Sequence, residues 1–105
     1  PTADLAAKVV ACGNCSGRHI DKFARFGLTA APASQVAAPL LEECFASLEC
    51  RVADSRWARR YCLFVLEVVK AWVDPSDGAP TTLHHRGRGE FMIAGRTIRL
   101  PSRMK

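Results

Sequence analysis

The chain has 105 residues, of which 49% are hydrophobic and 24% charged, and its formal net charge at pH 7 is +5. Such a composition is typical of a folded globular domain and excludes a disordered tail, and the length suits one domain. No apolar stretch approaches the ~20 residues of a membrane-spanning helix, and the first residues lack the pattern of a secretory leader, so we expect no membrane partner.

The positive charge is concentrated at the C-terminal end. Residues 1–82 carry nine basic and nine acidic side chains, whereas residues 83–105 carry six basic side chains and one acidic side chain, Glu90. A basic end suits an anionic partner such as phosphate or nucleic acid, but it also suits a solvated strand. The chain has five cysteines, an odd number that does not make a complete disulfide framework, and we expect a reducing, cytoplasmic location.

Three short helices are expected in the first half of the chain. Thr2 is a candidate cap for a helix that ends before Gly13, and the shared face of Ile20, Phe23 and Phe26 predicts a second helix over His19–Phe26. Gly27 is the expected stop of this helix. Because Pro39 suits a first helical turn, a third helix is expected over Leu40–Ala46.

From Leu48 onward the pattern predicts strands. Apolar residues alternate over Leu48–Val52, which indicates a half-buried strand with Glu49 and Arg51 on its polar face. The apolar segment Tyr61–Val73 predicts a long, largely buried strand antiparallel to the first, with no helix after Leu48. A closing hairpin is expected over Phe91–Ala94 and Thr97–Leu100. These elements predict a mainly β fold with short helices, resembling a barrel.

Cys12 and Cys15 form a Cys-x-x-Cys motif. Thioredoxin-type redox centres and zinc sites both use this spacing. The pair follows a helix rather than a buried strand, and the other three cysteines are scattered, so incidental thiols are the favoured interpretation.

A loop rich in small residues precedes the second helix and carries two cations. Free backbone N–H groups, a hydroxyl and positive charge together suit an anion, and a nearby aromatic suits a planar ring. The same pattern also suits a capped surface helix. The residues concerned are Ser16, Gly17, Arg18, Lys22 and Phe23.

The segment His84–Gly89 reads His-His-Arg-Gly-Arg-Gly. Adjacent histidines on a strand point to opposite faces, so the two do not readily share a metal. The Arg-Gly repeat resembles an RNA-binding tract, but it is short, and a turn with a basic rim explains it as well.

Taken in order, several segments make the chain similar to the flavin reductase-like family, which includes flavoredoxin and whose members are FMN-binding split β-barrels. The resemblance covers nearly the whole chain, and it departs from the family where Tyr61 replaces a histidine and where Cys15 replaces Thr or Ser. The segments that carry it are Pro1–Leu5, Gly13–Arg18, Asp21–Phe23, Gly27–Thr29, Ala38–Cys44, Leu48–Cys50, Leu83–Gly89 and Leu100–Arg103.

The resemblance implies a partial split β-barrel, with residues 1–105 forming the C-terminal part of one domain. It also implies an oxidoreductase that passes a hydride from NAD(P)H to FMN, and a homodimer with the flavin near the subunit interface. A non-catalytic flavin- or anion-binding module and a small nucleic-acid binder are the alternatives. The implied flavin site, with no metal and no catalytic residue assigned, consists of Ser16, Gly17, Arg18, Lys22, Phe23 and His84.

Overall fold

The structure, a computed structural model, describes residues 1–76, 78–97 and 100–101 and begins with a 3-10 turn, η1 (Ala3–Leu5). The first helix, α1 (Ala6–Gly13), follows directly, close to the predicted range. Thr2 does not cap a backbone amide as expected, because its hydroxyl donates to the Asp4 carboxylate instead.

The second helix, α2, spans only Lys22–Phe26 and not the predicted His19–Phe26. It is shorter because the Asp21 carboxylate accepts hydrogen bonds from the backbone of Phe23 and Ala24, which makes Asp21 the cap. Gly27 ends the helix as predicted, in the left-handed conformation at φ 57°.

The predicted third helix over Leu40–Ala46 is wrong. Leu40–Leu41 is a short strand, β2, antiparallel to β1 (Ala30–Ala31), and Ala46 already belongs to the next strand. The Glu42 amide also donates to the Thr29 carbonyl at 3.1 Å, which extends the pairing by one bond. Pairing with a distant segment thus overrides the local helical preference of Leu40–Ala46.

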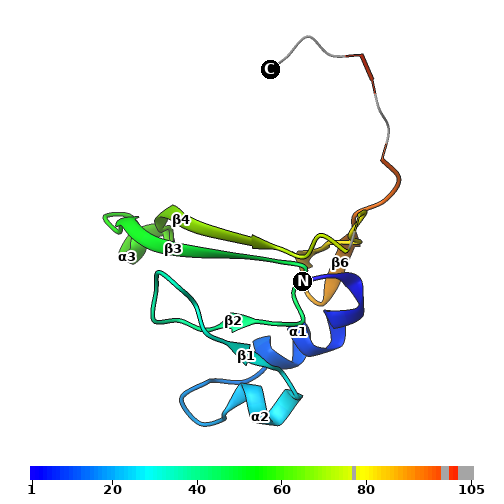
Figure 1. The fold of residues 1–105 in the computed structure, drawn as a ribbon. Helices are drawn as coiled ribbons and strands as arrows, with labels where there is room; N and C mark the ends of the chain where they lie inside the picture. The colour runs from blue at the N-terminus through cyan, green and yellow to red at the C-terminus, as the bar shows by residue number, and fades with distance from the viewer. Residues whose placement is uncertain (77, 98–99, 102–105) are drawn as a thin grey trace.

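The longest elements, β3 (Ala46–Asp54) and β4 (Val65–Val73), are antiparallel neighbours, as predicted. A one-turn helix, α3 (Ala58–Tyr61), lies at the end of this hairpin, so the expectation of no helix after Leu48 is wrong. The hydrogen bonds of α3 are local, and Cys62, at φ 52°, ends it. Tyr61 therefore belongs to α3 and not to the strand, and Figure 1 shows α3 at the far end of the β3–β4 hairpin.

The C-terminal hairpin lies earlier than predicted. It consists of β5 (Leu83–Gly87) and β6 (Glu90–Ile93), joined through Arg88 and Gly89, and not of segments 91–94 and 97–100. Gly87 at φ 101° and Gly89 at φ 77° make this turn possible, since both conformations favour glycine. Thr97 is irregular, and residues 98 and 99 of the predicted return strand lie outside the described residues.

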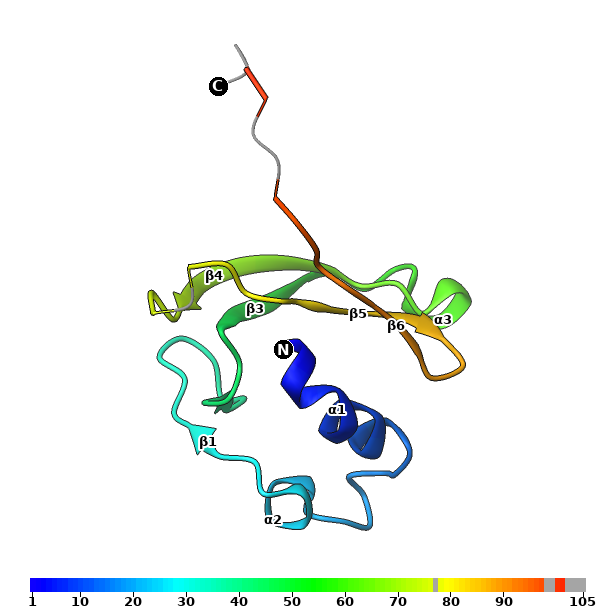
Figure 2. The ribbon, with the colours of Figure 1, turned by 90° about the vertical axis from the view of Figure 1, so that its right-hand side faces the viewer.

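The start of the chain is joined to the segment that leads into β5. Thr2 bridges to Thr82 next to β5, and the Ala3 amide donates to the Thr81 carbonyl at 2.9 Å. Figure 2 shows β3, β4, β5 and β6 in one layer, with α1, α2 and β1 below them. The structure thus confirms the predicted class, mainly β with short helices.

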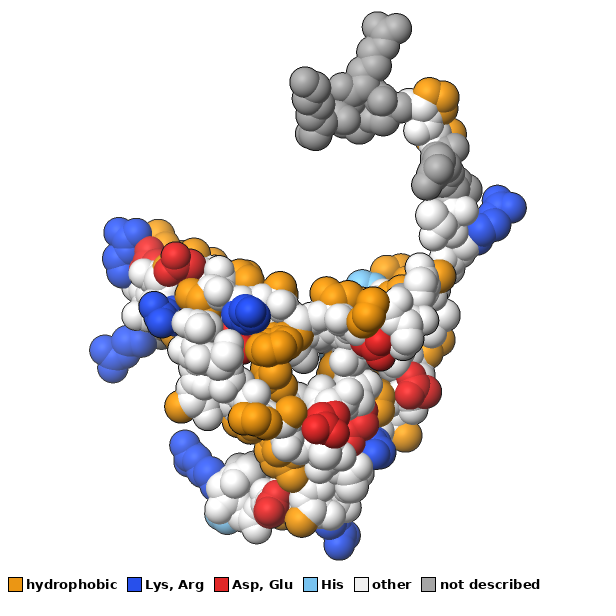
Figure 3. All heavy atoms as spheres, in the orientation of Figure 1, with side chains coloured by type: hydrophobic (Ala, Val, Ile, Leu, Met, Phe, Trp, Pro, Cys, Tyr) orange, Lys and Arg blue, Asp and Glu red, His pale blue; other side chains and the backbone are white. Residues whose placement is uncertain are grey.

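Little of the apolar surface is covered. Leu5 and Glu49 are the only buried residues among those described, and the exposed surface is 8952 Å², against about 5,800 Å² for a compact protein of this mass. The prediction that β4 is largely buried is wrong, since Leu66 and Val73 are 53% and 67% exposed. Figure 3 shows hydrophobic side chains over much of the visible face. Among the described residues, no helix has the length and apolar character needed to cross a bilayer.

Candidate functional site

The loop between α1 and α2 carries three of the predicted site residues, and a fourth, Lys22, is the first residue of α2. Ser16, Gly17 and Arg18 are exposed, and the Ser16 hydroxyl accepts a hydrogen bond from the Arg18 amide at 3.2 Å. The hydroxyl proton of Ser16 stays available to a ligand, because the oxygen acts as acceptor here. The Arg18 guanidinium makes no hydrogen bond or ion pair within the described part of the chain.

Lys22 ties the loop to the end of α1. Its ammonium donates to the Cys12 carbonyl at 2.7 Å, and Lys8 makes the corresponding bond from α1 to the Gly27 carbonyl, also at 2.7 Å. Both cations therefore lie at carbonyls near helix C-termini, where positive charge is stabilising. Lys22 keeps two further donors for a ligand, since an ammonium carries three.

The start of α2 contributes less to anion binding than the sequence indicates. The amides of Phe23 and Ala24, which would point at an anion, already donate to Asp21 at 2.9 and 3.2 Å. This carboxylate also places a negative charge next to the loop. An anion at the loop would therefore be held by Ser16, Arg18 and Lys22 and not by the helix terminus.

Phe23 and His84 lie on different elements. Phe23 is half-buried in α2 beside the loop, whereas His84 is exposed on β5, with its Nε2 atom 2.9 Å from the Thr82 hydroxyl. Among the described residues, no hydrogen bond joins His84 to the loop. The neighbouring His85 points to the opposite face of the strand, where its ring packs on Phe91 with centroids 4.9 Å apart.

The five cysteines are free, and they form no metal-binding group in the described chain. The Cys15 thiol donates to the Ala11 carbonyl at 3.4 Å, within the last turn of α1. Cys12 lies instead at a separate apolar cavity of about 220 Å³, which Cys44 also lines. The two thiols of the Cys-x-x-Cys motif thus have different surroundings.

Glu49 is the most buried residue described, although the sequence placed it on the polar face of its strand. It is 1% exposed, whereas its neighbour Leu48 is 60% exposed. Its carboxylate accepts hydrogen bonds from the backbone of a loop before β2 and from an indole on β4. The donors are the amide and hydroxyl of Ser34, the amides of Gln35 and Val36, and Nε1 of Trp72.

These bonds keep the Glu49 carboxylate charged. Burial by itself raises the pKa of Glu49, but hydrogen bonds from Ser34, Trp72 and Gln35 outweigh it and lower the pKa from 4.5 to about 2. With its charge held by donors of the chain itself, Glu49 anchors the loop at residues 34–36 to the β3–β4 hairpin. We assign it a structural role.

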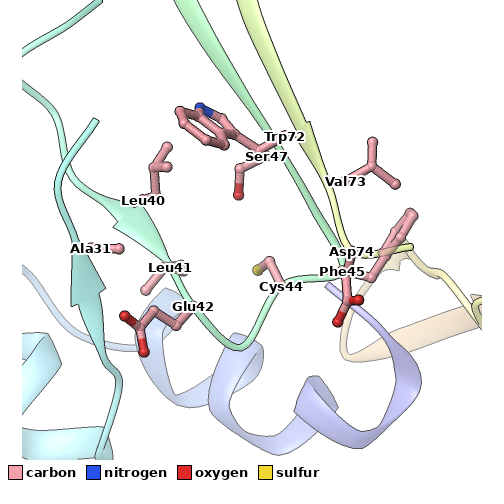
Figure 4. Close-up of a pocket in the computed structure, with 10 residues that line it drawn as sticks. All are labelled: Ala31, Leu40, Leu41, Glu42, Cys44, Phe45, Ser47, Trp72, Val73 and Asp74. Carbon is pink, nitrogen blue, oxygen red and sulfur yellow. The ribbon is translucent and has the colours of Figure 1, made fainter. Parts of the chain in front are cut away.

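A cavity of about 220 Å³ lies between this hairpin and β2, with the side chains of Leu40, Cys44 and Trp72 around it (Figure 4). Ligand pockets usually measure about 300–1,000 Å³, so this cavity is too small for a flavin. Two carboxylates line it, on Glu42 and Asp74, and the Asp74 carboxylate accepts hydrogen bonds from the amide and hydroxyl of Ser76.

Comparison with known proteins gives one family match and several relatives. A model of the flavin reductase like domain matches residues 2–91. The chain is 34% identical over 100 residues to the protein YddH of Escherichia coli K12, covering 84% of this chain and 53% of YddH. It is 35% identical over 69 residues to an uncharacterized protein of Archaeoglobus fulgidus, covering 66% of this chain and 39% of that protein.

Two solved structures share the fold. One is an FMN-binding domain of a flavin reductases-like enzyme from Shewanella baltica OS155, with a TM-score of 0.83 and 23% identity over 96% of this chain and 60% of that chain. The other is flavoredoxin of Desulfovibrio vulgaris (Miyazaki F), with a TM-score of 0.77 and 24% identity over 95% and 58%. The predicted partial split β-barrel is therefore confirmed. The chain spans about half the length of the curated relatives it matches.

Proposed function

Because the chain belongs to the flavin reductase-like family, we propose that residues 1–105 are the C-terminal part of a single FMN-binding domain that passes a hydride from NAD(P)H to FMN. The family match over most of the chain carries this proposal. The FMN-binding domain from Shewanella baltica, which has the same fold, supports it.

The loop between α1 and α2 suits the FMN phosphate. The Ser16 hydroxyl and the exposed Arg18 guanidinium would donate to it, with one of the remaining Lys22 protons, and Phe23 would lie toward the ring. Gly17 leaves this approach open, while His84 stays a predicted contact from β5. When bound, FMN supplies the ring that accepts the hydride, and the chain supplies orientation and charge.

We extend the proposal to a homodimer in a reducing compartment. More than half of the surface of Leu66, Val68 and Val73 is exposed on β4, and apolar surface of this extent favours a covering partner. The free state of all five cysteines is consistent with the cytoplasm.

Two measurements on the purified protein test the function. Quenching of flavin fluorescence measures FMN binding. The fall in absorbance at 340 nm measures oxidation of NADH or NADPH, and we expect this oxidation when FMN is present. If the protein binds FMN but oxidises neither NADH nor NADPH, it is a non-catalytic flavin-binding module and not a reductase. Absence of FMN binding, with salt-sensitive binding of RNA, would favour the nucleic-acid binder.

The variant Arg18→Ala tests the loop. A charge-assisted hydrogen bond to phosphate is strong, so we expect FMN binding to weaken about ten- to a hundredfold. Arg25→Ala, at the far end of α2, is the matched control and should change the Kd less than threefold. If Arg18→Ala binds FMN as tightly as the parent, the loop is a helix connection without a role in binding.

A further inference from the structure

The far end of the β3–β4 hairpin carries an exposed surface that the proposed FMN site does not use. Figure 1 shows α3 at this end, and we define the α3 patch as α3 together with the residues on either side of it, 55–64. Every residue of the patch except Ala58 is exposed. In the described structure, this end of the hairpin is therefore open to a partner.

The α3 patch is rich in large apolar side chains. Two aromatic rings lie together on it, since the ring centroids of Trp57 and Tyr61 are 5.7 Å apart. Trp57 is 48% exposed and Tyr61 is 58% exposed, while Leu63 and Phe64, which follow shortly after, are each 53% exposed. These four side chains thus present about half of their surface to solvent within one short segment, and contiguous apolar patches mark interaction sites.

The α3 patch is also positively charged, and Figure 3 shows basic side chains at this end of the molecule. The patch contains Arg56, Arg59 and Arg60 and no acidic residue. Asp54, just before the patch, neutralises Arg56 through an ion pair of 2.6 Å. Arg59 makes no hydrogen bond or ion pair among the described residues, and the Arg60 guanidinium lies over the Tyr61 ring, 5.4 Å from its centroid. Two guanidinium charges are thus without an acidic partner in the described part of the chain.

We propose that the α3 patch binds the surface of an anionic lipid bilayer, with its apolar side chains among the headgroups and with Arg59 and Arg60 on lipid phosphates. Trp and Tyr favour the membrane–water interface because each has an apolar body and a polar tip. Arginine suits the same position, since its stem lies along apolar surface while its guanidinium hydrogen-bonds to phosphate. This inference goes beyond the proposed function, because it concerns a different surface and a different partner.

The apolar part of the patch favours a bilayer over the other large anion, a nucleic acid. Single-stranded nucleic acids bind where a base can stack on an open aromatic face. Arg60 already covers one face of the Tyr61 ring, and the rings of Trp57 and Tyr61 are inclined at 42°, so they form no parallel slot for a base. Leu63 and Phe64 extend the apolar surface, which suits the boundary between headgroups and acyl chains.

Binding of this kind needs no membrane-spanning segment. The expectation of no membrane partner was based on the absence of an apolar stretch of ~20 residues, whereas a patch that lies on the bilayer needs only apolar side chains and positive charge. In the cytoplasm, the location proposed above, the leaflet that faces the protein carries the anionic lipids.

Sedimentation of the full chain with lipid vesicles tests the proposal. We expect stronger binding to vesicles of phosphatidylcholine with phosphatidylserine than to vesicles of phosphatidylcholine alone, and weaker binding at high salt, because salt screens the charges. The double variant Arg59→Gln/Arg60→Gln should weaken binding to the anionic vesicles about twenty-fivefold, since each arginine near the surface contributes about fivefold. The double variant Arg25→Gln/Arg86→Gln removes the same charge from exposed positions elsewhere and should change binding less than threefold.

Trp57→Ala tests the apolar part of the patch without changing its charge. We expect it to weaken binding to the anionic vesicles about five- to tenfold, because part of the apolar surface that enters the headgroup region is lost. The tryptophan emission of the parent should shift to shorter wavelength when anionic vesicles are added, and this shift should be largely absent in Trp57→Ala.

Several results would overturn the proposal. The parent would fail to bind anionic vesicles, or the Arg59→Gln/Arg60→Gln variant would bind them as tightly as the parent. Binding of a single-stranded RNA that this variant loses, with no vesicle binding by the parent, would assign the patch to a nucleic acid. A parent dimer that becomes a monomer in this variant, again with no vesicle binding, would make the patch a subunit interface. FMN binding is measured separately and should be equal in parent and variant.

Discussion

The indole N–H of Trp72 donates to the carboxylate of Glu49 at 2.7 Å, from one strand of the β3–β4 hairpin to the other. The two residues are diagonal neighbours, because Trp72 is paired with Ser47 and Glu49 with Lys70. The same carboxylate holds the amides of residues 34–36. One acidic side chain thus joins two strands and a loop.

We expect Glu49→Gln to lower the melting temperature by several degrees. The glutamine amide group would place N–H donors against the N–H donors of Ser34 and Gln35, leaving some of them buried without an acceptor. Thermal unfolding followed by circular dichroism measures the change. Glu67→Gln, on the exposed part of β4, is the control, and an equal loss in both variants would contradict the anchoring role of Glu49.

The stabilisation from Glu49 should depend on pH. Its pKa is lowered from 4.5 to about 2 in the folded protein, so the charged form stabilises the fold above about pH 4.5 and this contribution is lost as the pH falls toward 2. The difference in denaturation midpoint between the parent and Glu49→Gln should be constant at neutral pH and shrink across that window. Asp54 and Asp74 also have lowered pKa values, and the subtraction removes their shared contribution. A difference that stays the same down to pH 2 would contradict the lowered pKa.

Asp21 should have opposite effects on stability and on anion binding. Asp21→Ala removes the cap of α2 and should cost about 1 kcal/mol, whereas Asp21→Asn keeps an acceptor and should cost less. Both changes remove a negative charge from the end of the loop that carries Ser16 and Arg18, so FMN should bind at least as tightly as in the parent. Weaker FMN binding by Asp21→Asn would place the phosphate away from this loop.

The Cys-x-x-Cys motif should be dispensable for flavin reduction. The Cys15 thiol donates to the carbonyl of Ala11 in the preceding helix, α1, whereas Cys12 lines an apolar cavity that Cys15 does not line. Replacing both by serine should leave the rate of NAD(P)H oxidation within a few-fold of the parent. A loss of several orders of magnitude would restore the redox interpretation.

The sequence predicts those features that local patterns determine. The β3–β4 pairing, the Gly27 stop and the fold class follow from alternation, glycine chemistry and the family resemblance. The prediction of a third helix was wrong because Leu40–Leu41 pairs with Ala30–Ala31, ten residues earlier. No local sequence pattern indicates that pairing. The predicted position of the C-terminal hairpin was wrong because Gly87 and Gly89, both at positive φ, form the turn before Phe91 rather than after it.

Which face of β3 is buried could not be predicted from the sequence, for a different reason. Alternation indicates that two faces differ, but which face is covered depends on what packs against it. Here a loop covers Glu49 while Leu48 and Val52 are exposed. In the candidate site, Ser16, Arg18 and Lys22 were predicted from a Gly-containing loop that leads into a helix, and their role in binding stays a prediction. His85 and Arg88 lie beside α1 whereas His84 and Arg86 do not line that space, and the register of the β5–β6 hairpin, which the sequence does not reveal, decides this.

The left-handed conformation of Arg88 makes the turn between β5 and β6 less stable than it would be with glycine at that position. A residue with a side chain at φ 52° is less stable there than glycine by about 1 kcal/mol, and glycine occupies the positions on either side. Arg88→Gly should therefore make the β5–β6 hairpin more stable. Selection for stability alone would favour a third glycine in this turn.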